Sequence, residues 1–370
     1  MNNEKIFLMR PGIGPEELDA IREVMDSKFL TEGDQTREFE KRIAEYIGVK
    51  HAIAVTSCTT ALELALQVAG IKKGAEVVVP DFTHPATALP VLSAGAEPVL
   101  VDVSDQSYNI DFGSARLGLS RRTRCVMPVS LFGRPVDQEG LAEFLHRRQL
   151  VVIEDAACSL GAEVNGKKVG TLADMTCFSF HPRKILTTGE GGMLVTDNDE
   201  YAEIARSIKS FGFGPRRGTM RGIRRGSNYK MSNILAAIGL VQISKFEKML
   251  AERIKRARIY NELLIGNESI QLPNIPDGVK CTYQSYCVSL KRDGIRDQVK
   301  QRMLEKGIEV QIGTYALHLE PVFARAKRTR LVKSLKVFRN TLTLPLHNEL
   351  RREDQERVCA ELEATIRSVD

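Results

Sequence analysis

The chain of 370 residues has no tryptophan, and phenylalanine, tyrosine and tryptophan together make up only 6% of it. No apolar run approaches the roughly 20 residues that are needed to cross a bilayer, so the sequence predicts no membrane-spanning segment. The amino terminus, from Met1 to Ile6, lacks the apolar core of a secretory signal. We therefore expect the protein to lie in the cytoplasm.

Seven cysteines are present, at positions 58, 125, 158, 177, 281, 287 and 359, and no two of them form a CxxC pair. An odd number with such spacing predicts reduced, mostly buried thiols and neither a disulfide framework nor a metal site. With 43% hydrophobic and 27% charged residues, the chain can bury a sizeable core. We expect one large and one smaller domain.

The net charge of +6 comes largely from residues 215–230, which contain basic side chains among glycines: Arg216, Arg217, Arg221, Arg224, Arg225 and Lys230. Guanidinium groups in such a loop can hold a diphosphate through paired hydrogen bonds, or the loop can be a solvated surface segment. No recognition helix or aromatic platform accompanies it, so we expect no nucleic-acid binding. We expect a second basic cluster, residues 325–330, to be a solvated loop or helix face.

Alternating strands and helices from about residue 51 to residue 210 predict an α/β fold with a mostly parallel sheet flanked by helices. We expect strands at 51–56, 76–79, 97–101, 125–129, 151–154, 175–180 and 192–196, and helices at 16–26, 37–47, 60–69 and 232–255. Beyond residue 261 a strand at 283–290 and helices at 296–306 and 354–366 predict a smaller α+β domain. The predicted division is 1–250 for the large domain, with its amino-terminal helical segment, and 251–370 for the small one.

Two charged residues lie at the ends of apolar strands. Lys184 stands between the strand at 175–180 and a glycine-rich turn; it can act as a nucleophile if its environment disfavours the ammonium form, or it can be a surface lysine beside Arg183. Asp155 ends the apolar run 150–155, at the edge of a parallel sheet where ligands bind. A buried carboxylate there needs a positive partner, such as a protonated pyridine nitrogen; a helix cap or a structural ion pair is the alternative.

A third candidate lies between the strand at 51–56 and the following helix, in Ser57, Cys58 and Thr59. Unpaired backbone N–H groups at a helix N-terminus suit a phosphate, although ordinary N-capping explains these residues equally well. Ser179, five residues before Lys184, can add a hydroxyl to the same anion.

Taken together, these segments resemble the nucleotide-sugar aminotransferases of the DegT/StrS type, within the fold-type I enzymes that use pyridoxal 5′-phosphate (PLP). The matching segments, in order, are FLTEG at 29–33, SCTTAL at 57–62, GAEVVVP at 74–80, THPAT at 83–87, EDAA at 154–157, FSFHPRK at 178–184, GEGG at 189–192 and GSNYKMS at 226–232.

The resemblance implies that Lys184 forms the Schiff base with PLP and moves the proton, while Asp155 keeps the pyridine nitrogen protonated. Cys58, Thr59 and Ser179 fall on the phosphate-binding positions, with Cys58 at a place where the family commonly has glycine. Asn228 matches an asparagine that reaches the phosphate of the neighbouring subunit, which implies a homodimer with shared active sites.

Other positions carry open alternatives. His84 matches an aromatic residue that stacks over the pyridine, or it is a turn histidine bonded to backbone. Cys158 replaces a glutamine or histidine of many members, and its role stays open. Tyr315 and His318 match the substrate side of the cofactor, where they can bind sugar hydroxyls or a carboxylate; each can instead be buried and satisfied by backbone.

The sequence therefore predicts PLP-dependent transamination of a keto-sugar, nucleotide-linked, with an amino acid such as glutamate as the donor. The alternatives are a PLP-dependent sugar dehydrase and a non-catalytic regulatory protein with this fold. Dehydrases of the group carry histidine in place of the lysine, and a non-catalytic member would lose the lysine or the aspartate. The presence of Lys184 and Asp155 speaks against both alternatives.

Overall fold

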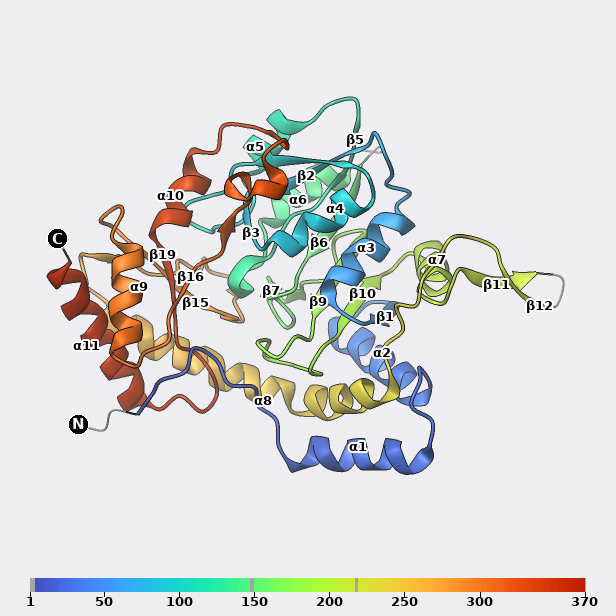
Figure 1. Ribbon diagram of the computed structural model, residues 1–370, viewed down its shortest axis with the longest axis horizontal. Helices are drawn as coiled ribbons and strands as arrows, with labels where there is room; N and C mark the ends of the chain where they lie inside the picture. The colour runs from blue at the N-terminus through green and yellow to red at the C-terminus, as the bar shows by residue number, and fades with distance from the viewer. Residues whose placement is uncertain (1–3, 147–149, 217–218, 370) are drawn as a thin grey trace.

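An eight-stranded sheet runs through the larger part of the protein in the computed structural model, which describes residues 4–146, 150–216 and 219–369 (Figure 1). The strand order is β1 (His51–Val55), β10 (Gly192–Thr196), β9 (Met175–Ser179), β6 (Val151–Asp155), β5 (Thr123–Val126), β2 (Glu76–Pro80), β4 (Glu97–Val101) and β18 (Lys327–Arg328). Neighbours from β9 to β18 are parallel, whereas β10 is antiparallel to both β1 and β9. The predicted α/β class with a mostly parallel sheet is confirmed.

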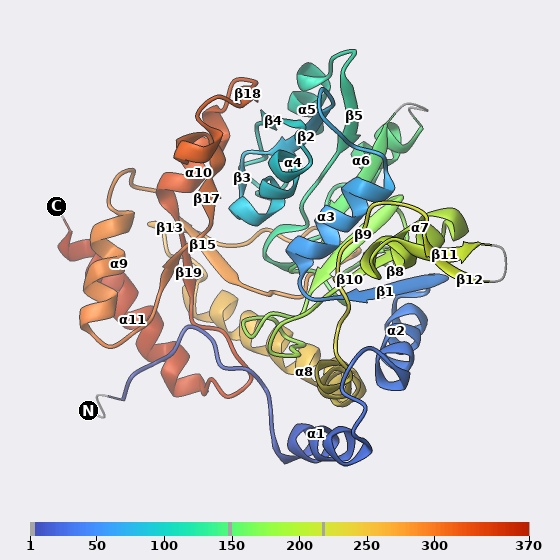
Figure 2. The same ribbon diagram turned by 45° about the vertical axis from the view of Figure 1, so that its right-hand side comes forward.

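Strict alternation along the strands gives this sheet two apolar faces. Ile153 and Leu194 point to the face covered by α3 (Cys58–Val68), α4 (Leu89–Ser93) and α7 (Asp199–Lys209), which Figure 2 shows in front of the strands. Val152 and Met193 point to the opposite face, covered by α2 (Asp34–Ile47), α5 (Phe112–Gly118), α6 (Gln138–Leu145) and α8 (Asn233–Leu264). Burial of both faces explains why these strands are nearly continuous apolar runs.

Helix α8 joins the two parts of the molecule, and α1 (Pro15–Ser27) packs along it. Its N-cap Ser232 accepts a hydrogen bond from the N–H of Leu235 at 3.4 Å. The helix extends to Leu264, nine residues beyond the predicted end, because its second half buries Tyr260 and Leu264 in a separate core. The domain boundary predicted at residues 250 and 251 lies inside this helix.

A smaller antiparallel sheet forms the core of the carboxyl-terminal part, in the order β13 (Ile270–Gln271), β15 (Tyr286–Leu290), β19 (Thr341–Leu344) and β16 (Gln311–Ile312). Helices α9 (Arg296–Glu305) and α11 (Arg352–Ser368) pack against it together with the end of α8. Ile6 pairs with Ile308 and joins this core, so the amino-terminal segment lies beside the carboxyl-terminal part (Figure 1).

The strand predicted at 283–290 begins only at Tyr286. Tyr283 has a φ of +48°, which an extended strand does not allow. The N–H groups of Thr282 and Ser285 bond instead to the carbonyls of Gly133 and Phe132, at 3.0 and 3.3 Å. Residues 282–285 are therefore a loop that is fastened to the large part of the molecule.

Residues 315–340 return to the large part of the molecule. Strand β17 (Tyr315–Ala316) pairs with β3 (Phe82–Thr83), and α10 (Val332–Asn340) follows β18. The expectation of a loop or helix at 325–330 is wrong for β18, because its backbone pairs with β4 and extends the sheet by one strand. The side chains of Lys327 and Arg328 are exposed, as expected.

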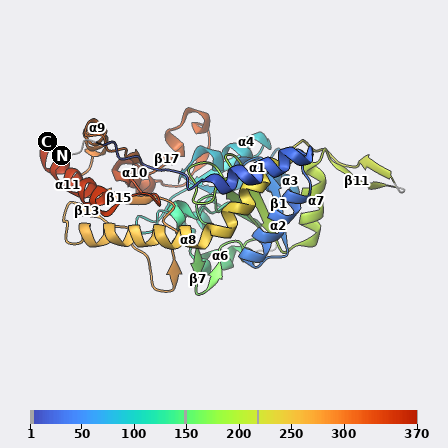
Figure 3. The same cartoon turned by 90° about the horizontal axis from the view of Figure 1, so that it is seen from below.

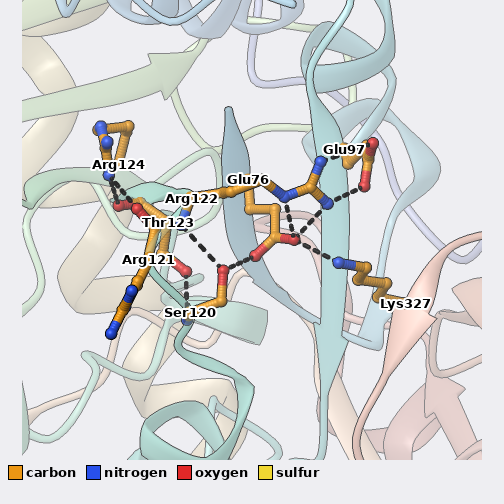
Figure 4. A network of polar contacts seen from close by, with 8 residues as sticks. All are labelled: Glu76, Glu97, Ser120, Arg121, Arg122, Thr123, Arg124 and Lys327. Carbon is orange, nitrogen blue, oxygen red and sulfur yellow. Dashed lines mark hydrogen bonds and ion pairs between the residues drawn. The ribbon is translucent and has the colours of Figure 1, made fainter. Parts of the chain in front are cut away.

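A charged network fixes this edge (Figure 4). Glu76, 1% exposed, accepts hydrogen bonds from Arg122 Nη2 at 2.6 Å, from Lys327 Nζ at 2.5 Å and from the hydroxyl of Ser120. Arg122 also donates to Glu97 at 2.7 Å. The network ties residue 327 of the carboxyl-terminal part to strands β2 and β4, so the two parts of the chain are interlocked.

The remaining short elements lie at the periphery. The hairpin of β11 (Phe213–Arg216) and β12 (Thr219–Gly222) projects away from the body of the molecule (Figure 3). A three-stranded sheet is formed by β14 (Val279–Lys280), β7 (Glu163–Val164) and β8 (Lys167–Lys168), and single 3₁₀ turns occur at Pro85–Thr87, Leu131–Gly133, Leu317–Leu319 and Pro321–Phe323. Within the described ranges, none of the helices combines the length and apolar character that a bilayer crossing requires.

Candidate active site

A cavity of about 520 Å³ opens at the carboxyl ends of β6 and β9, where the two parts of the chain meet. Seven residues predicted from the sequence line it: Cys58, Thr59, His84, Asp155, Cys158, Ser179 and Lys184. Residues from the carboxyl-terminal part close the other side, among them Arg253, Gln284, Gln311, Thr314 and Thr343. The structure thus brings together side chains that are more than 280 residues apart in the sequence.

Lys184 lies in the loop between β9 and β10, with its own N–H bonded to the carbonyl of His181 at 2.8 Å. Its Nζ donates to Sγ of Cys158 at 3.2 Å. Burial lowers the pKa of the Lys184 ammonium, but Cys158, and then Cys58 and Asp155, outweigh burial, and the pKa is raised above its usual value. In the chain by itself, these groups therefore favour the ammonium form of Lys184.

Asp155 is 5% exposed, at the end of β6. Its Oδ2 accepts a hydrogen bond from the hydroxyl of Thr87 at 2.7 Å, and its Oδ1 accepts one from the N–H of Ala157 at 3.1 Å. No cation among the described residues forms an ion pair with it. The carboxylate is thus oriented by neutral donors and available to a positive group in the cavity. Thr87 stands in a segment that carries the resemblance, but sequence reasoning did not single it out.

The first turn of α3 faces the same cavity. The hydroxyl of Ser57 accepts a hydrogen bond from the N–H of Thr60 at 3.1 Å, so N-capping is present. The N–H groups of Cys58 and Thr59 belong to the first turn, which has no intrahelical acceptors, and both residues line the cavity. The cap therefore leaves the N–H groups of Cys58 and Thr59 available to an anion in the cavity.

Gly192 supports that helix end from β10. A Cβ placed there would lie 2.3 Å from the carbonyl carbon of Ser57 and 2.5 Å from the nitrogen of Cys58. Only a residue without a side chain allows strand and helix end to approach so closely. Ser179 completes this side of the cavity, and its hydroxyl accepts a hydrogen bond from the N–H of His181 at 3.3 Å.

His84 lines the cavity and also bonds to backbone. Its Nδ1 accepts a hydrogen bond from the N–H of Ala86 at 3.1 Å, and its ring meets the ring of Tyr315 edge-on at 5.5 Å. Burial, and then Lys184, lower the pKa of His84 below its usual value, which favours a neutral ring. His84 is therefore a turn histidine bonded to backbone, and its ring also lies at the cavity wall.

Three predicted residues do not line the cavity. Tyr315 lies against the ring of His84. His318 donates its backbone N–H to the fully buried Asp81 at 2.7 Å, and its Nδ1 lies at the same distance from the second carboxylate oxygen. Asn228 is exposed at the base of the β11–β12 hairpin, where its backbone pairs with Ser210. Arg221 and Arg225 of the basic loop are exposed, and Arg217 lies outside the described residues.

Sequence reasoning missed Arg253 and Gln284. Arg253 is 2% exposed on α8, and its Nε and Nη2 donate to the carbonyls of Tyr283 and Gln284 at 2.7 and 2.6 Å. Burial lowers the pKa of Arg253 to about 9, since no carboxylate among the described residues neutralises it. Arg253 stands among other charged residues of α8 and Gln284 among polar and aromatic ones, so no local signal in the sequence marks either of them.

Lys184 follows β9, Asp155 ends the neighbouring parallel strand β6, and the first turn of α3 faces the same cavity, which is the arrangement that the resemblance to the aminotransferases implies. Residues 11–363 match the DegT/DnrJ/EryC1/StrS aminotransferase family, and the chain belongs to that family. The resemblance seen in the sequence is thus confirmed, and so is the prediction of an enzyme.

Individual proteins to which the chain is similar support this family assignment. The chain is 38% identical over 368 residues to GDP-perosamine synthase of Caulobacter vibrioides, with 98% of each chain covered. It is 34% identical over 359 residues to dTDP-4-dehydro-2,3,6-trideoxy-D-glucose 4-aminotransferase of Saccharopolyspora spinosa, covering 93% of this chain and 92% of the relative. The crystal structure of the aminotransferase TlmJ from Streptoalloteichus hindustanus superimposes with a TM-score of 0.93 at 31% identity, covering 98% and 99% of the two chains.

Proposed function

We propose that this protein transfers an amino group from glutamate to a nucleotide-linked keto-sugar, with PLP as cofactor. The observation that carries the proposal is the meeting of Lys184, Asp155 and the first turn of α3 at one cavity. Relatives named for GDP-linked and dTDP-linked sugars support the substrate class. Glutamate is proposed as the donor by resemblance alone.

The donor set at the cavity fits PLP. The N–H groups of Cys58 and Thr59 and the hydroxyl of Ser179 can hold a phosphate, and Asp155 can hold a protonated pyridine nitrogen. When bound, PLP supplies an electron sink for the carbon that loses its proton. Lys184 would supply the amine that holds the cofactor and the base that moves this proton, and His84 would contribute an aromatic wall beside it.

The wall of the cavity that the carboxyl-terminal part forms selects the substrate. Gln311, Thr314 and Thr343 belong to the carboxyl-terminal part and line the cavity with polar groups suited to sugar hydroxyls. The described residues of the basic loop at 215–230 do not line the cavity of their own chain, and we assign this loop to the diphosphate at the site of a partner subunit.

A homodimer with shared active sites accounts for the exposed position of Asn228. The hairpin region that precedes Asn228 exposes four large apolar side chains: Phe211, Phe213, Met220 and Ile223. Exposed apolar side chains on a projecting hairpin are typical of a surface that a partner covers.

All seven cysteines are unpaired, and all but Cys158 are buried, which fits a reducing compartment such as the cytoplasm.

The test is turnover with defined substrates. Purified protein with PLP and glutamate is mixed with GDP-, dTDP- and UDP-linked keto-sugars, and 2-oxoglutarate and amino sugar are measured by NMR and mass spectrometry. We expect at least one substrate to react, and Lys184→Ala to abolish the reaction while keeping the far-UV circular dichroism spectrum. Lys280→Ala, which removes a lysine paired with Glu163 outside the cavity, serves as the control. Full turnover by Lys184→Ala would overturn the proposal.

A further inference from the structure

The side chain of Gln284 binds both peptide groups that flank Lys184. Its Nε2 donates to the carbonyl of Arg183 at 2.6 Å, and its Oε1 accepts from the N–H of Ile185 at 3.2 Å. A carboxamide carries one donor and one acceptor group side by side, so it can satisfy both peptide groups at once. Gln284 is 7% exposed and lines the cavity beside Lys184.

The loop that carries Gln284 is itself held in an unfavourable conformation. Tyr283 has a φ of +48°, a strained conformation that a non-glycine residue keeps only when its surroundings enforce it. Arg253 provides that enforcement, because its buried guanidinium bonds the carbonyls of residues 283 and 284 at 2.7 and 2.6 Å. The guanidinium has no carboxylate partner among the described residues, so its charge is directed at these two carbonyls.

The same loop contacts the large part of the molecule at two further points. The hydroxyl of Thr282 donates to the carbonyl of Cys158 at 3.0 Å, and its N–H donates to the carbonyl of Gly133. A Cβ at Gly133, whose φ is +95°, would lie 2.2 Å from that hydroxyl oxygen. Residues 282–284 thus bond to the backbone of Cys158 and of both neighbours of Lys184. The side chains of Cys158 and Lys184 themselves meet at 3.2 Å.

We infer that Gln284 is a positioning residue for Lys184, and that through it the carboxyl-terminal part sets where the lysine amine stands in the cavity. This inference rests on the proposed role of Lys184 as the residue that holds PLP. Lys184 has a long side chain, and its reach toward the cofactor depends on a fixed backbone. Three backbone bonds provide it: the two made by Gln284 and the one from the N–H of Lys184 to the carbonyl of His181. Preorganisation of this kind speeds a reaction by holding the reacting groups in place.

The experiment compares Gln284→Leu, which keeps the size but loses both bonds, with Gln284→His, whose neutral ring again offers a donor and an acceptor. The matched control is Gln355→Leu. Gln355 is fully buried, and its Nε2 donates to the carbonyl of Arg256 at 2.8 Å, outside the cavity. Hydrogen exchange of the peptide 181–188 is measured in the protein without PLP, and then the rate of PLP uptake is measured from the visible absorption.

We expect at least tenfold faster exchange at Ile185 and roughly 10- to 100-fold slower PLP uptake in Gln284→Leu, with partial recovery in Gln284→His and no change in Gln355→Leu. With a keto-sugar that turns over, kcat falls while KM stays within about twofold. Exchange and uptake like those of wild type in Gln284→Leu would overturn the inference.

If Gln284→Leu does not fold, Gln284→Asn carries the test, because it keeps the amide but shortens its reach by one methylene. A wild-type protein that takes up no PLP would contradict the proposed function, whereas the exchange measurement would still decide whether Gln284 holds the loop of Lys184.

Discussion

The Nζ of Lys184 lies 3.2 Å from the Sγ of Cys158, on the side of the cavity formed by β6 and the loop after β9. Cys158 is the one cysteine of the seven that is not buried. The pair explains why the pKa of Lys184 is raised although burial acts against its charge. The contact with Cys158 therefore favours the ammonium form of Lys184, whereas an amine attacks a carbonyl only in its neutral form.

Replacing Cys158 by alanine should lower the pKa of Lys184, because Cys158 is the group that most strongly raises this pKa against the effect of burial. A lower pKa gives a larger neutral fraction at a given pH, so PLP uptake at pH 7.5 should become several-fold faster. Its pH profile should move to lower pH. Stopped-flow absorption between pH 6 and pH 10 measures this. A profile that is unchanged, or that moves to higher pH, would contradict the role given to Cys158.

Gly192→Ala should damage the anion site at α3. The new Cβ would lie 2.3 Å from the carbonyl carbon of Ser57, and backbone has to move to admit it. We expect about 1–3 kcal/mol of destabilisation and at least tenfold weaker PLP binding, measured by urea unfolding and by titration. Gly222→Ala is the control, because a Cβ there has no neighbour closer than 3.9 Å. Equal PLP affinity in both variants would show that the close approach does not support the site.

Glu76→Gln should remove a pH-dependent part of the stability. Burial acts to raise the pKa of Glu76, but Lys327, Ser120 and Arg122 outweigh it and lower the pKa to about 2 from about 4.5. A lowered pKa gives stability that is complete above pH 4.5 and is lost as the pH falls toward 2. We expect the variant to be about 1–3 kcal/mol less stable at pH 7, with a smaller difference at pH 3.5. Unfolding in urea at both pH values checks this, and a difference that grows on acidification would refute it.

Glu154→Gln should have the opposite pH signature. Burial raises the pKa of Glu154 to about 7, against the hydrogen bond from Ser130 at 2.5 Å. The folded protein therefore binds the extra proton between about pH 4.5 and pH 7, and its stability falls as the pH rises through that window. Glutamine keeps an acceptor for Ser130 without the charge, so the variant should lose this dependence and gain relative stability at pH 8. Thermal unfolding from pH 5 to pH 8 measures it; parallel curves for the two proteins would rule the assignment out.

The sequence was sufficient to predict that candidate residues which follow strands in local motifs lie at one cavity. Lys184, Asp155 and Cys58 each stand where an apolar run ends, and parallel strands bring such ends to one edge of a sheet. The antiparallel place of β10 was not predicted, although no helix separates it from β9 as a parallel crossover would require.

Gln284 was beyond prediction because its partners Arg183 and Ile185 are 101 and 99 residues away, and its neighbours alternate like a strand. Strand β18 has only two residues, both basic, and it exists because β4 offers an open edge. In each case a contact between residues far apart in the sequence determines the local structure, and the propensities of the neighbouring residues do not predict that contact.

The most direct test of the central claim is the visible absorption of the purified protein with PLP, before and after addition of glutamate. The account predicts a band from PLP bound to Lys184 that is lost when glutamate donates its amino group, with 2-oxoglutarate released in equal amount. The Lys184→Ala variant should show no such conversion. A wild-type protein that binds no PLP, or a Lys184→Ala variant that converts like wild type, would contradict it.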